Sequence, residues 1–378
     1  MNNFLAGDIG GTKTRLAVIG VCGTQVRVVH EAAYPSRNYA AFEALLGDFL
    51  SGIDAPADVA FGIAGPVQGR VVQTTNLPWR IDADALQRQF GFARCTLLND
   101  LEATAYGLPA LGANDLLTLQ AGVPGASGNA AVIAAGTGLG EAGLFWDGQH
   151  HQPFATEGGH ASFSPGDELD IAFLRHLGET TDRTTSHLTN PAKNAGQVIG
   201  YSHSTELQKT AAKPVLSVVE GPLVIRQQHR HVSWERVVSG MGLVSLHEFL
   251  CQHRHIEAPQ WLAEEMHGGD AAAAISAAAL SGRDEICAET LARFVCLYGA
   301  EAGNLALKVM SCGGLYLGGG IAPKILPLLQ NGAFLDAFLN KGRMRPLLEA
   351  MPVRVILNDR AALFGSALRA AQFARDAA

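Results

Sequence analysis

The chain lacks the charge pattern of several classes of protein. Charged residues make up only 17% of its 378 residues, and Asp plus Glu (35) outnumber Lys plus Arg (28). The formal net charge of −7 and the absence of a sustained Lys/Arg stripe argue against a nucleic-acid partner. The same balance gives no general positive field, so an anion would have to be bound by local backbone amides and metal ions.

Cysteines are few and long apolar runs are absent. None of the six cysteines forms a CxxC pair, and most lie within apolar segments: Cys22, Cys95, Cys251, Cys287, Cys296 and Cys312. We therefore expect reduced, buried thiols in a cytoplasmic protein, without disulfides or zinc. No stretch approaches the ~20 apolar residues of a membrane helix. Because a turn motif begins at Gly7, we expect no signal peptide.

The length of the chain favours two lobes. A chain of 378 residues exceeds what one compact core usually holds, so we expect two lobes with a cleft between them. The hydrophobic content of 48% is ordinary for a globular protein and is sufficient to fill such cores.

The chain opens with a pattern that predicts strand, glycine turn and strand. Residues 4–6 and 15–19 are apolar and flank a glycine turn at 7–14, which predicts an antiparallel hairpin rather than a strand that leads into a helix. The same pattern returns at 130–146 around a turn at 136–140. We interpret the two as an internal repeat in shape, although not in sequence.

The remaining elements follow from periodicity. From about 178 to 231 the chain is polar with little periodicity, which is typical of an insertion, a mobile flap or a disordered loop. Elsewhere the patterns predict helices at about 39–52, 82–90 and 101–108, strands at 58–63 and 96–98, a mostly helical later chain, strands at 314–317 and 353–357, and a last helix after Asp359.

Two familiar nucleotide motifs fail their structural tests. The phosphate-loop pattern GxxxxGK[ST] is nearly present at 7–14, but Thr12 stands in place of its second glycine and a strand follows. A GxGxxG match at 138–143 also leads into a strand, which excludes a dinucleotide-binding unit. The two hairpin turns could still hold phosphate through glycine amides and threonine hydroxyls, with Asp8 binding Mg²⁺ through water; otherwise they are plain hairpin turns.

Several motifs together carry a resemblance to a known family. Residues 7–12 and 136–140 resemble the two phosphate motifs of the superfamily of actin, hexokinase and heat-shock chaperone ATPases, and 317–321 resembles its adenosine motif. Within it, three segments look like signatures of bacterial-type glucokinases: Asn99-Asp100, 157–160 and 235–240. The likeness covers about 1–177 and 232–372.

The resemblance excludes one branch of related kinases. Kinases of the ROK group follow the histidine that corresponds to His160 with a cysteine zinc motif, but Ala161 to Ser164 contains no cysteine. The chain is therefore identified as a member of the non-ROK family, without zinc.

The resemblance implies the fold and its division. The expected fold is α/β, a two-lobed actin-like ATPase (ribonuclease H-like) fold with an active-site cleft between the lobes. Residues 1–112 with about 358–378 would form the small lobe. Residues 113–357 would form the large lobe, with the atypical insertion at about 178–231.

Asp100 is the candidate catalytic base. From the residues alone, a carboxylate at the end of a buried strand could accept a proton or could cap the helix that follows. The resemblance implies that Asp100 matches the catalytic aspartate of the family. It further implies sugar contacts from Asn99, Asp100, Glu157, His160, Glu235 and the smaller lobe's Gly65, Pro66, Thr75 and Asn76.

The resemblance also implies a nucleotide site. Its expected residues are Asp8, Gly10, Gly11, Thr12, Lys13, Gly136, Thr137, Gly138, Gly240, Gly318, Gly319 and Gly320. The implied activity is that of a glucokinase, which transfers the γ-phosphoryl group of ATP to the 6-hydroxyl of glucose at the entry to glycolysis. ATP and Mg²⁺ are the implied cofactors, and a homodimer is the implied assembly.

Alternatives remain open at this point. The same mechanism could serve fructose, mannose or an amino sugar, because the polar ligands do not define the shape of the pocket. ADP or polyphosphate could replace ATP. A non-catalytic sugar-sensing protein of the same fold is a further alternative.

Overall fold

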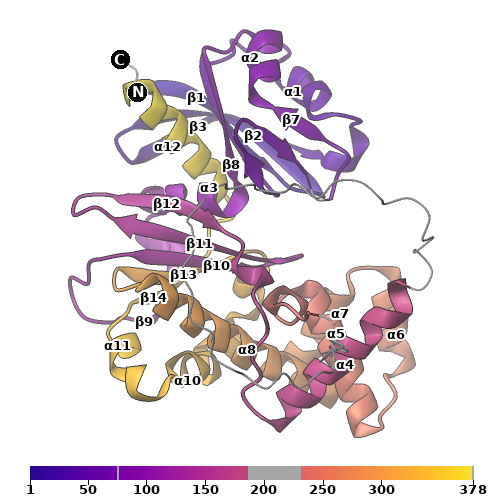
Figure 1. Ribbon diagram of the computed structural model, residues 1–378. Coiled ribbons are helices and arrows are strands. Elements are labelled where there is room, and N and C mark those ends of the chain that lie inside the picture. Colours follow the sequence, from indigo (N-terminus) through magenta and orange to yellow (C-terminus); the bar gives the residue numbers. More distant parts are fainter. Residues whose placement is uncertain (75, 186–230, 377–378) are drawn as a thin grey trace, which may run out of the picture. The chain divides into compact units, whose positions relative to one another are not determined.

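The computed structural model describes residues 1–74, 76–185 and 231–376 (Figure 1). The chain divides into two compact units, one formed by Met1–Ser164 and Ser233–Ala378 and the other by Pro165–Val232. Thr75 and most of the expected insertion lie outside the described residues. The first unit contains all three sheets and is the one described below.

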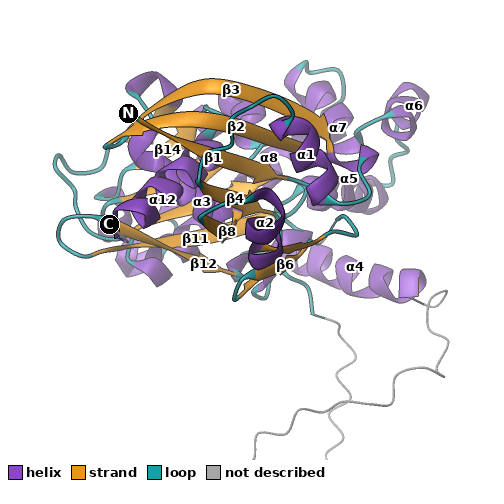
Figure 2. Ribbon diagram, turned by 90° about the horizontal axis from the view of Figure 1, so that it is seen from above, coloured by secondary structure: helices purple, strands orange, loops and turns teal. Residues whose placement is uncertain are grey.

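The first sheet has the strand order β3-β2-β1-β4-β8. Its strands are β1 (Asn2–Ile9), β2 (Lys13–Cys22), β3 (Gln25–Pro35), β4 (Asp58–Ile63) and β8 (Arg94–Asn99), seen side by side in Figure 2. β1 and β2 form the predicted antiparallel hairpin, and β3 pairs antiparallel with β2. β1, β4 and β8 are parallel. The carboxyl ends of these three strands therefore lie at one edge of the sheet.

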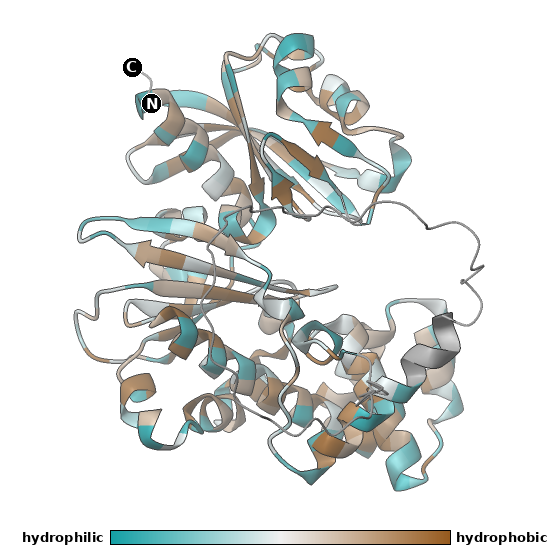
Figure 3. Cartoon of the chain, viewed as in Figure 1, coloured by the Kyte–Doolittle hydropathy of each residue, from teal (hydrophilic) through white to brown (hydrophobic). Residues whose placement is uncertain are grey.

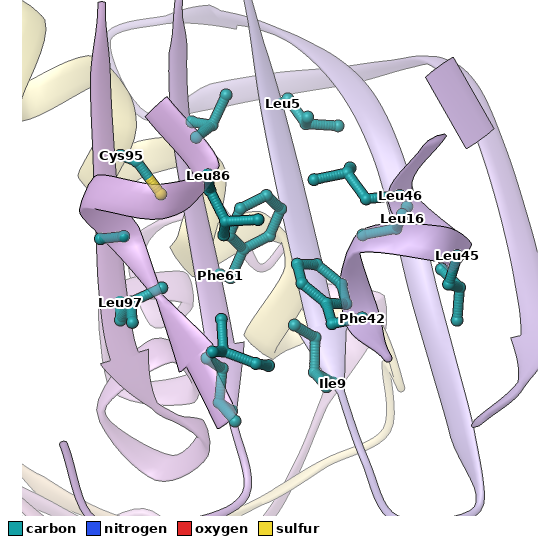
Figure 4. Close-up of a cluster of buried hydrophobic side chains, with 14 of the residues drawn as sticks. Leu5, Ile9, Leu16, Phe42, Leu45, Leu46, Phe61, Leu86, Cys95 and Leu97 are labelled. Atoms are coloured by element: carbon teal, nitrogen blue, oxygen red, sulfur yellow. The ribbon is translucent and has the colours of Figure 1, made fainter. Parts of the chain in front are cut away.

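Apolar side chains cover both faces of this sheet. On one face, helices α1 (Phe42–Leu50) and α2 (Ala83–Phe90) pack their buried leucines and Phe42 against Leu5 and Phe61 (Figure 4). On the other face, α12 (Ala361–Asp376) packs on β1 and β4 and against α3 (Asp100–Gly107). This double coverage explains the apolar runs of the parallel strands.

The second sheet has the order β12-β11-β10-β13-β14-β9. β10 pairs antiparallel with β11 and parallel with β13, just as β1 pairs with β2 and β4, so the predicted repeat in shape is confirmed. The long helix α8 (Glu285–Val309) is anchored to this sheet where the Tyr298 hydroxyl donates to the Ile133 carbonyl at 3.2 Å. The sheet comprises β9 (Leu116–Gln120), β10 (Ala130–Ala135), β11 (Leu139–Trp146), β12 (His151–Thr156), β13 (Gly314–Gly318) and β14 (Val353–Ile356).

The other elements are shorter or lie outside the two large sheets. A third sheet of three short strands, which the sequence patterns did not predict, follows β4: β5 (Val67–Gln68), β6 (Val71–Gln73) and β7 (Arg80–Asp82). The remaining helices are α4 (Glu168–Thr185), α5 (Gly240–Arg254), α6 (Gln260–Gly268), α7 (Ala271–Leu280), α8 (Glu285–Val309), α9 (Leu326–Gln330), α10 (Ala333–Leu339) and α11 (Arg345–Glu349).

The observed elements match the α/β prediction, and a further difference from the sequence patterns lies in α4. α4 continues to Thr185, so the first residues of the segment expected to be irregular from about 178 are helical. Hydrophobic residues recur along the strands of both large sheets (brown in Figure 3). Among the described residues, no helix is both long enough and apolar enough to cross a membrane.

Candidate active site

A cavity of about 1030 Å³ lies where the strand ends of the two large sheets meet. Its wall contains residues at or just beyond the carboxyl ends of β1, β4, β8, β13 and β14, together with the turn between β10 and β11. Open α/β sheets commonly bind ligands at the carboxyl ends of their strands. Of the predicted site residues, the cavity is lined by Asp8, Gly10, Gly11, Gly65, Pro66, Asn76, Asn99, Asp100, Gly136, Thr137, Gly138, Glu157, His160, Glu235, Gly318, Gly319 and Gly320.

The first glycine turn joins β1 to β2. The Gly10 N–H donates to the Lys13 carbonyl at 3.1 Å, and the Ser36 hydroxyl donates to the Gly10 carbonyl at 2.8 Å. In the described part of the chain, the N–H groups of Gly11 and Thr12 have no hydrogen-bond acceptor. These amides are therefore available to an anion.

The second glycine turn joins β10 to β11 and is hydrogen-bonded to the first residue of α5. The Gly136 N–H donates to the Gly138 carbonyl and the Gly240 N–H donates to the Gly136 carbonyl, both at 2.8 Å. A Cβ atom on Gly138 would overlap the Glu235 carboxylate, so a larger residue here would have to displace that side chain. Within the described residues, the Thr137 and Gly138 N–H groups also have no acceptor.

Asp100 is the first residue of α3, and Asn99 holds the capping position. The Asn99 side-chain oxygen accepts from the Leu101 and Glu102 N–H groups at 3.0 and 3.4 Å. The Asp100 carboxylate accepts from the Leu101 N–H at 2.9 Å and faces the cavity. The geometry therefore assigns the cap to Asn99 and leaves Asp100 at the ligand side.

Burial makes Asp100 and Asp8 weaker acids than usual. Burial and repulsion from Asp8 and Glu157 raise the pKa of Asp100 to about 7. Burial also raises the pKa of Asp8 to about 6, against the opposing effect of Arg15. A carboxyl group with a pKa near 7 is suited to proton transfer at neutral pH.

The polar loop after β12 presents two side chains to the cavity. Glu157 and His160 are well exposed, and their Oε2 and Nε2 atoms lie 3.9 Å apart. Between them, Gly158 and Gly159 lie so close to β11 that added Cβ atoms would overlap Glu141 and the Leu139 carbonyl, respectively. The two glycines thus allow the loop to lie against the sheet, with the side chains of Glu157 and His160 directed away from the sheet and toward the cavity.

The third glycine cluster follows β13. Gly319 has a φ of +79° and its Cβ would overlap the backbone of Ala135, which makes glycine necessary here. The chain then turns, and the Ile321 N–H donates to the Ala135 carbonyl at 3.2 Å. This cluster lines the cavity next to the second turn.

Three predicted nucleotide residues do not line the cavity. Thr12 and Lys13 are exposed, and Gly240 begins α5 behind the second turn. Lys13 and Gly240 are hydrogen-bonded to Gly10 and Gly136, which do line it. A direct role for these three residues stays a prediction.

Sequence reasoning missed two acidic residues of the cavity wall. Glu141 is 2% exposed, and its Oε1 atom has no hydrogen-bond partner in the described part of the chain. Burial and the neighbouring Glu301 raise the pKa of Glu141 to about 8. Asp359 forms an ion pair with Arg15 at 2.7 Å, which lowers the pKa of Asp359. The signal for Glu141 was a lone carboxyl group in the apolar strand 139–146.

The fold and the cavity define a class of protein. Two sheets that repeat the strand–glycine turn–strand unit, with both turns and an acidic strand end in one cavity, are the arrangement of the sugar kinases with an actin-like ATPase fold. The chain belongs to the glucokinase family, whose model matches residues 5–189 and 220–373. The predicted family and fold are thereby confirmed, and the family consists of ATP-dependent hexose kinases.

Individual relatives extend over nearly the whole chain. The glucokinase of Nostoc punctiforme is 38% identical over 98% of this chain and 100% of that protein. A crystal structure of glucokinase from an Antarctic psychrotroph, 27% identical, superposes with a TM-score of 0.75 over 98% of this chain and 99% of that one. A ROK-family glucokinase of Streptomyces griseus, solved with glucose and AMPPNP, shares the fold at a TM-score of 0.59 and 20% identity, over 98% of this chain and 100% of that one.

Proposed function

We propose that the protein transfers the γ-phosphoryl group of ATP to the 6-hydroxyl of glucose, which gives glucose 6-phosphate and ADP. The observation that carries this proposal is one cavity that combines two glycine turns with available amides and a carboxyl group whose pKa is about 7. Phosphoryl transfer needs mainly positioning and charge neutralisation, which these parts provide.

Asp100 would act as the general base in this reaction. Its carboxylate takes the proton of the 6-hydroxyl group while the sugar oxygen forms a bond to the γ-phosphorus and the bond from phosphorus to the ADP oxygen breaks. A general base is typically worth ~10²–10⁴ in rate. The other sugar hydroxyls would be bound by Asn99, Gly65, Asn76, Glu157, His160 and Glu235. Ionised carboxylates accept hydrogen bonds from hydroxyls, and imidazole and amide groups can both accept and donate them.

The glycine turns would hold the nucleotide. Among the described residues, the N–H groups of Gly11, Thr137 and Gly138 have no hydrogen-bond acceptor, so they are suited to bind phosphate oxygens. The third cluster at Gly318 to Gly320 would lie against the adenosine. The neighbouring Lys324 also lines the cavity and adds a positive charge at that end.

The carboxyl groups present fit a Mg²⁺ ion. Asp8 and Asp100 line one cavity and repel each other, so a cation near Asp8 would relieve a repulsion that now raises the pKa of Asp100. Asp8 would hold the ion through water, in keeping with the slow dehydration of Mg²⁺. When bound, Mg²⁺ would neutralise charge on the β- and γ-phosphates. A homodimer in the cytoplasm, acting at the entry to glycolysis, is the physiological form that we propose.

A coupled assay of the purified protein with MgATP and a panel of hexoses tests the proposal. We expect glucose to give the highest kcat/KM, with fructose, mannose and glucosamine at least ~10-fold lower, since a lost sugar hydrogen bond costs more than one kcal/mol. If another hexose is preferred, the glucose assignment is wrong. If no hexose is phosphorylated with ATP, ADP or polyphosphate, the protein is a non-catalytic relative.

A further inference from the structure

We propose that His247, Asp284, Cys287 and Cys251 form a binding site for Zn²⁺ or a similar thiolate-binding divalent cation. The ligand atoms of His247, Asp284 and Cys287 all lie within 4.8 Å of one another. The Sγ atom of Cys251 lies 3.7 Å from the Nε2 atom of His247. None of the four residues lines the active-site cavity, so the site is separate from the proposed kinase function.

Two packed helices bring the four side chains together. His247 and Cys251 are four residues apart on α5, which places both on one face of that helix. Asp284 is the N-cap of α8 and Cys287 is its third residue. The Asp284 carboxylate accepts from the Cys287 N–H at 2.7 Å, and such an outer hydrogen bond fixes the orientation of a ligating carboxylate.

The buried imidazole of His247 is the feature that points to a ligand. Its side chain is 2% exposed, and among the described residues the sulfur of Cys251 is the only hydrogen-bond partner of its ring. A thiol is a weak partner, and buried polar atoms are nearly always satisfied by stronger ones. A bound cation would satisfy the imidazole nitrogen and both sulfurs at once.

The donor set suits zinc. Two thiolates, one imidazole and one carboxylate are typical ligands of a tetrahedral Zn²⁺ site, in which ligand atoms are about 3.4–3.8 Å apart. Shifts of roughly 1 Å would bring the ligand atoms of His247, Asp284 and Cys287 to that spacing, and Cys251 would turn toward them from its place beside His247. Binding would release the protons of the Cys251 and Cys287 thiols.

A cavity gives the ion a route from solvent. It has a volume of about 660 Å³ and is bordered by His247 and Cys251. Further potential donors line the same cavity, namely Glu248, His255, Glu257 and His267. An ion could therefore reach His247 and Cys251 from solvent through this cavity.

The site would join the end of α5 to the start of α8. α5 begins at Gly240, whose N–H binds the turn at Gly136, so the ion would stabilise the helical layer beside this turn. We therefore expect the ion to change stability more than the rate of phosphoryl transfer.

The test uses untagged, full-length protein, stripped of metal under reducing conditions and titrated with Co²⁺. We expect one thiolate-bound Co²⁺ per chain, counted by near-ultraviolet thiolate-to-cobalt absorption that Zn²⁺ abolishes. We also expect a rise in Tm of at least about 2 °C at saturating Zn²⁺. The double variant Cys251→Ser/Cys287→Ser should lose both the absorption and the rise. The matched control Cys95→Ser/Cys312→Ser should keep both, because these thiols lie in other parts of the fold.

Two results would overturn the site. One is a wild-type protein that gives no thiolate-to-cobalt absorption in excess Co²⁺. The other is an absorption of equal strength in the double variant and the control. Glucose phosphorylation by each variant shows whether that variant is folded. If the double variant does not fold, the single variant Cys251→Ser, at a half-buried position, replaces it in the test.

Discussion

The Oε2 atom of Glu235 accepts a hydrogen bond from the backbone N–H of Leu139 at 3.1 Å. The contact joins residues 96 positions apart in the chain. It connects a predicted sugar ligand directly to the end of the second glycine turn, where phosphate is expected to bind. A single carboxylate would therefore affect both substrates.

Replacing Glu235 by Ala should raise KM for both glucose and MgATP, each by ~10-fold or more, because a hydrogen bond to a charged group is worth about 1.5–3 kcal/mol. The measurement is steady-state kinetics with each substrate varied in turn. Glu235→Gln should spare KM for MgATP, because the amide oxygen can still accept from Leu139. The control Glu157→Ala should raise KM for glucose alone, and an unchanged glucose KM in both Ala variants would remove these residues from the sugar site.

Two glycines of the second turn provide a matched pair. An added Cβ on Gly138 would overlap the Glu235 carboxylate, whereas the Cβ of an alanine at 136 would meet no atom within 4 Å. Gly138→Ala should therefore displace Glu235 and raise KM for glucose ~10-fold. Gly136→Ala should leave KM for glucose unchanged, whatever its effect on the nucleotide. Equal glucose KM values in the two variants would contradict the importance of this contact.

Asp100→Ala should lower kcat by at least ~10², the usual contribution of a general base, while glucose binding is largely retained. Because Asn99 rather than Asp100 caps α3, the melting temperature should not fall. Steady-state kinetics, glucose binding by calorimetry and thermal melting distinguish the two roles. Full turnover in this variant would show that the base lies elsewhere, and a large loss of stability would indicate a structural role.

The activity should depend on pH with an acidic limb near the pKa of Asp100, about 7. A base must be ionised to accept a proton, so kcat/KM should fall as pH decreases through this value, approaching tenfold per unit below it. The profile is measured from pH 5 to 9, with a return to pH 8 to show that the protein has not unfolded. A profile with no acidic limb between pH 5 and 9 would mean that Asp100 is an ordinary carboxylate in the free enzyme.

Glu141 should make the protein less stable as pH rises. Its folded-state pKa of about 8 lies above that of an unfolded glutamate, so its protonated form favours folding at low pH and this contribution is lost as pH rises through about 8. The side chain in Glu141→Gln stays neutral at every pH. The free energy of unfolding of this variant, taken relative to that of the wild type, should therefore be ~1–2 kcal/mol higher at pH 9 than at pH 6. Denaturant unfolding at both pH values measures the difference.

The control for this prediction is Glu157→Gln, which makes the same change at an exposed carboxyl group. Its stability should follow that of the wild type across the range. If Glu141→Gln also follows the wild type, the carboxyl group of Glu141 is not held protonated by burial and Glu301.

The amino-acid sequence by itself determined the main secondary-structure elements, the glycine turns and the expected activity. Alternating and continuous apolar runs fixed the main strands and helices, because burial on one face or both imposes a period on the sequence. Glycines at 10, 11, 136 and 138 marked the turns, because close backbone approach requires the absence of a side chain. The family motifs in their order then indicated the activity, and Asn99-Asp100 marked the end of a strand.

Only the tertiary structure decided which distant residues meet. Asn99 and Asp100 are adjacent in sequence, and their geometry separates the cap from the carboxylate that faces the cavity. The contact of Glu235 with Leu139 and the approach of Glu141 to Glu301 join residues that no local period relates. The same holds for the cluster at His247, whose cysteines show no metal-binding spacing in the sequence. Such contacts are set by the packing of helices on sheets, and the burial that they cause shifts the pKa values on which the proposed chemistry depends.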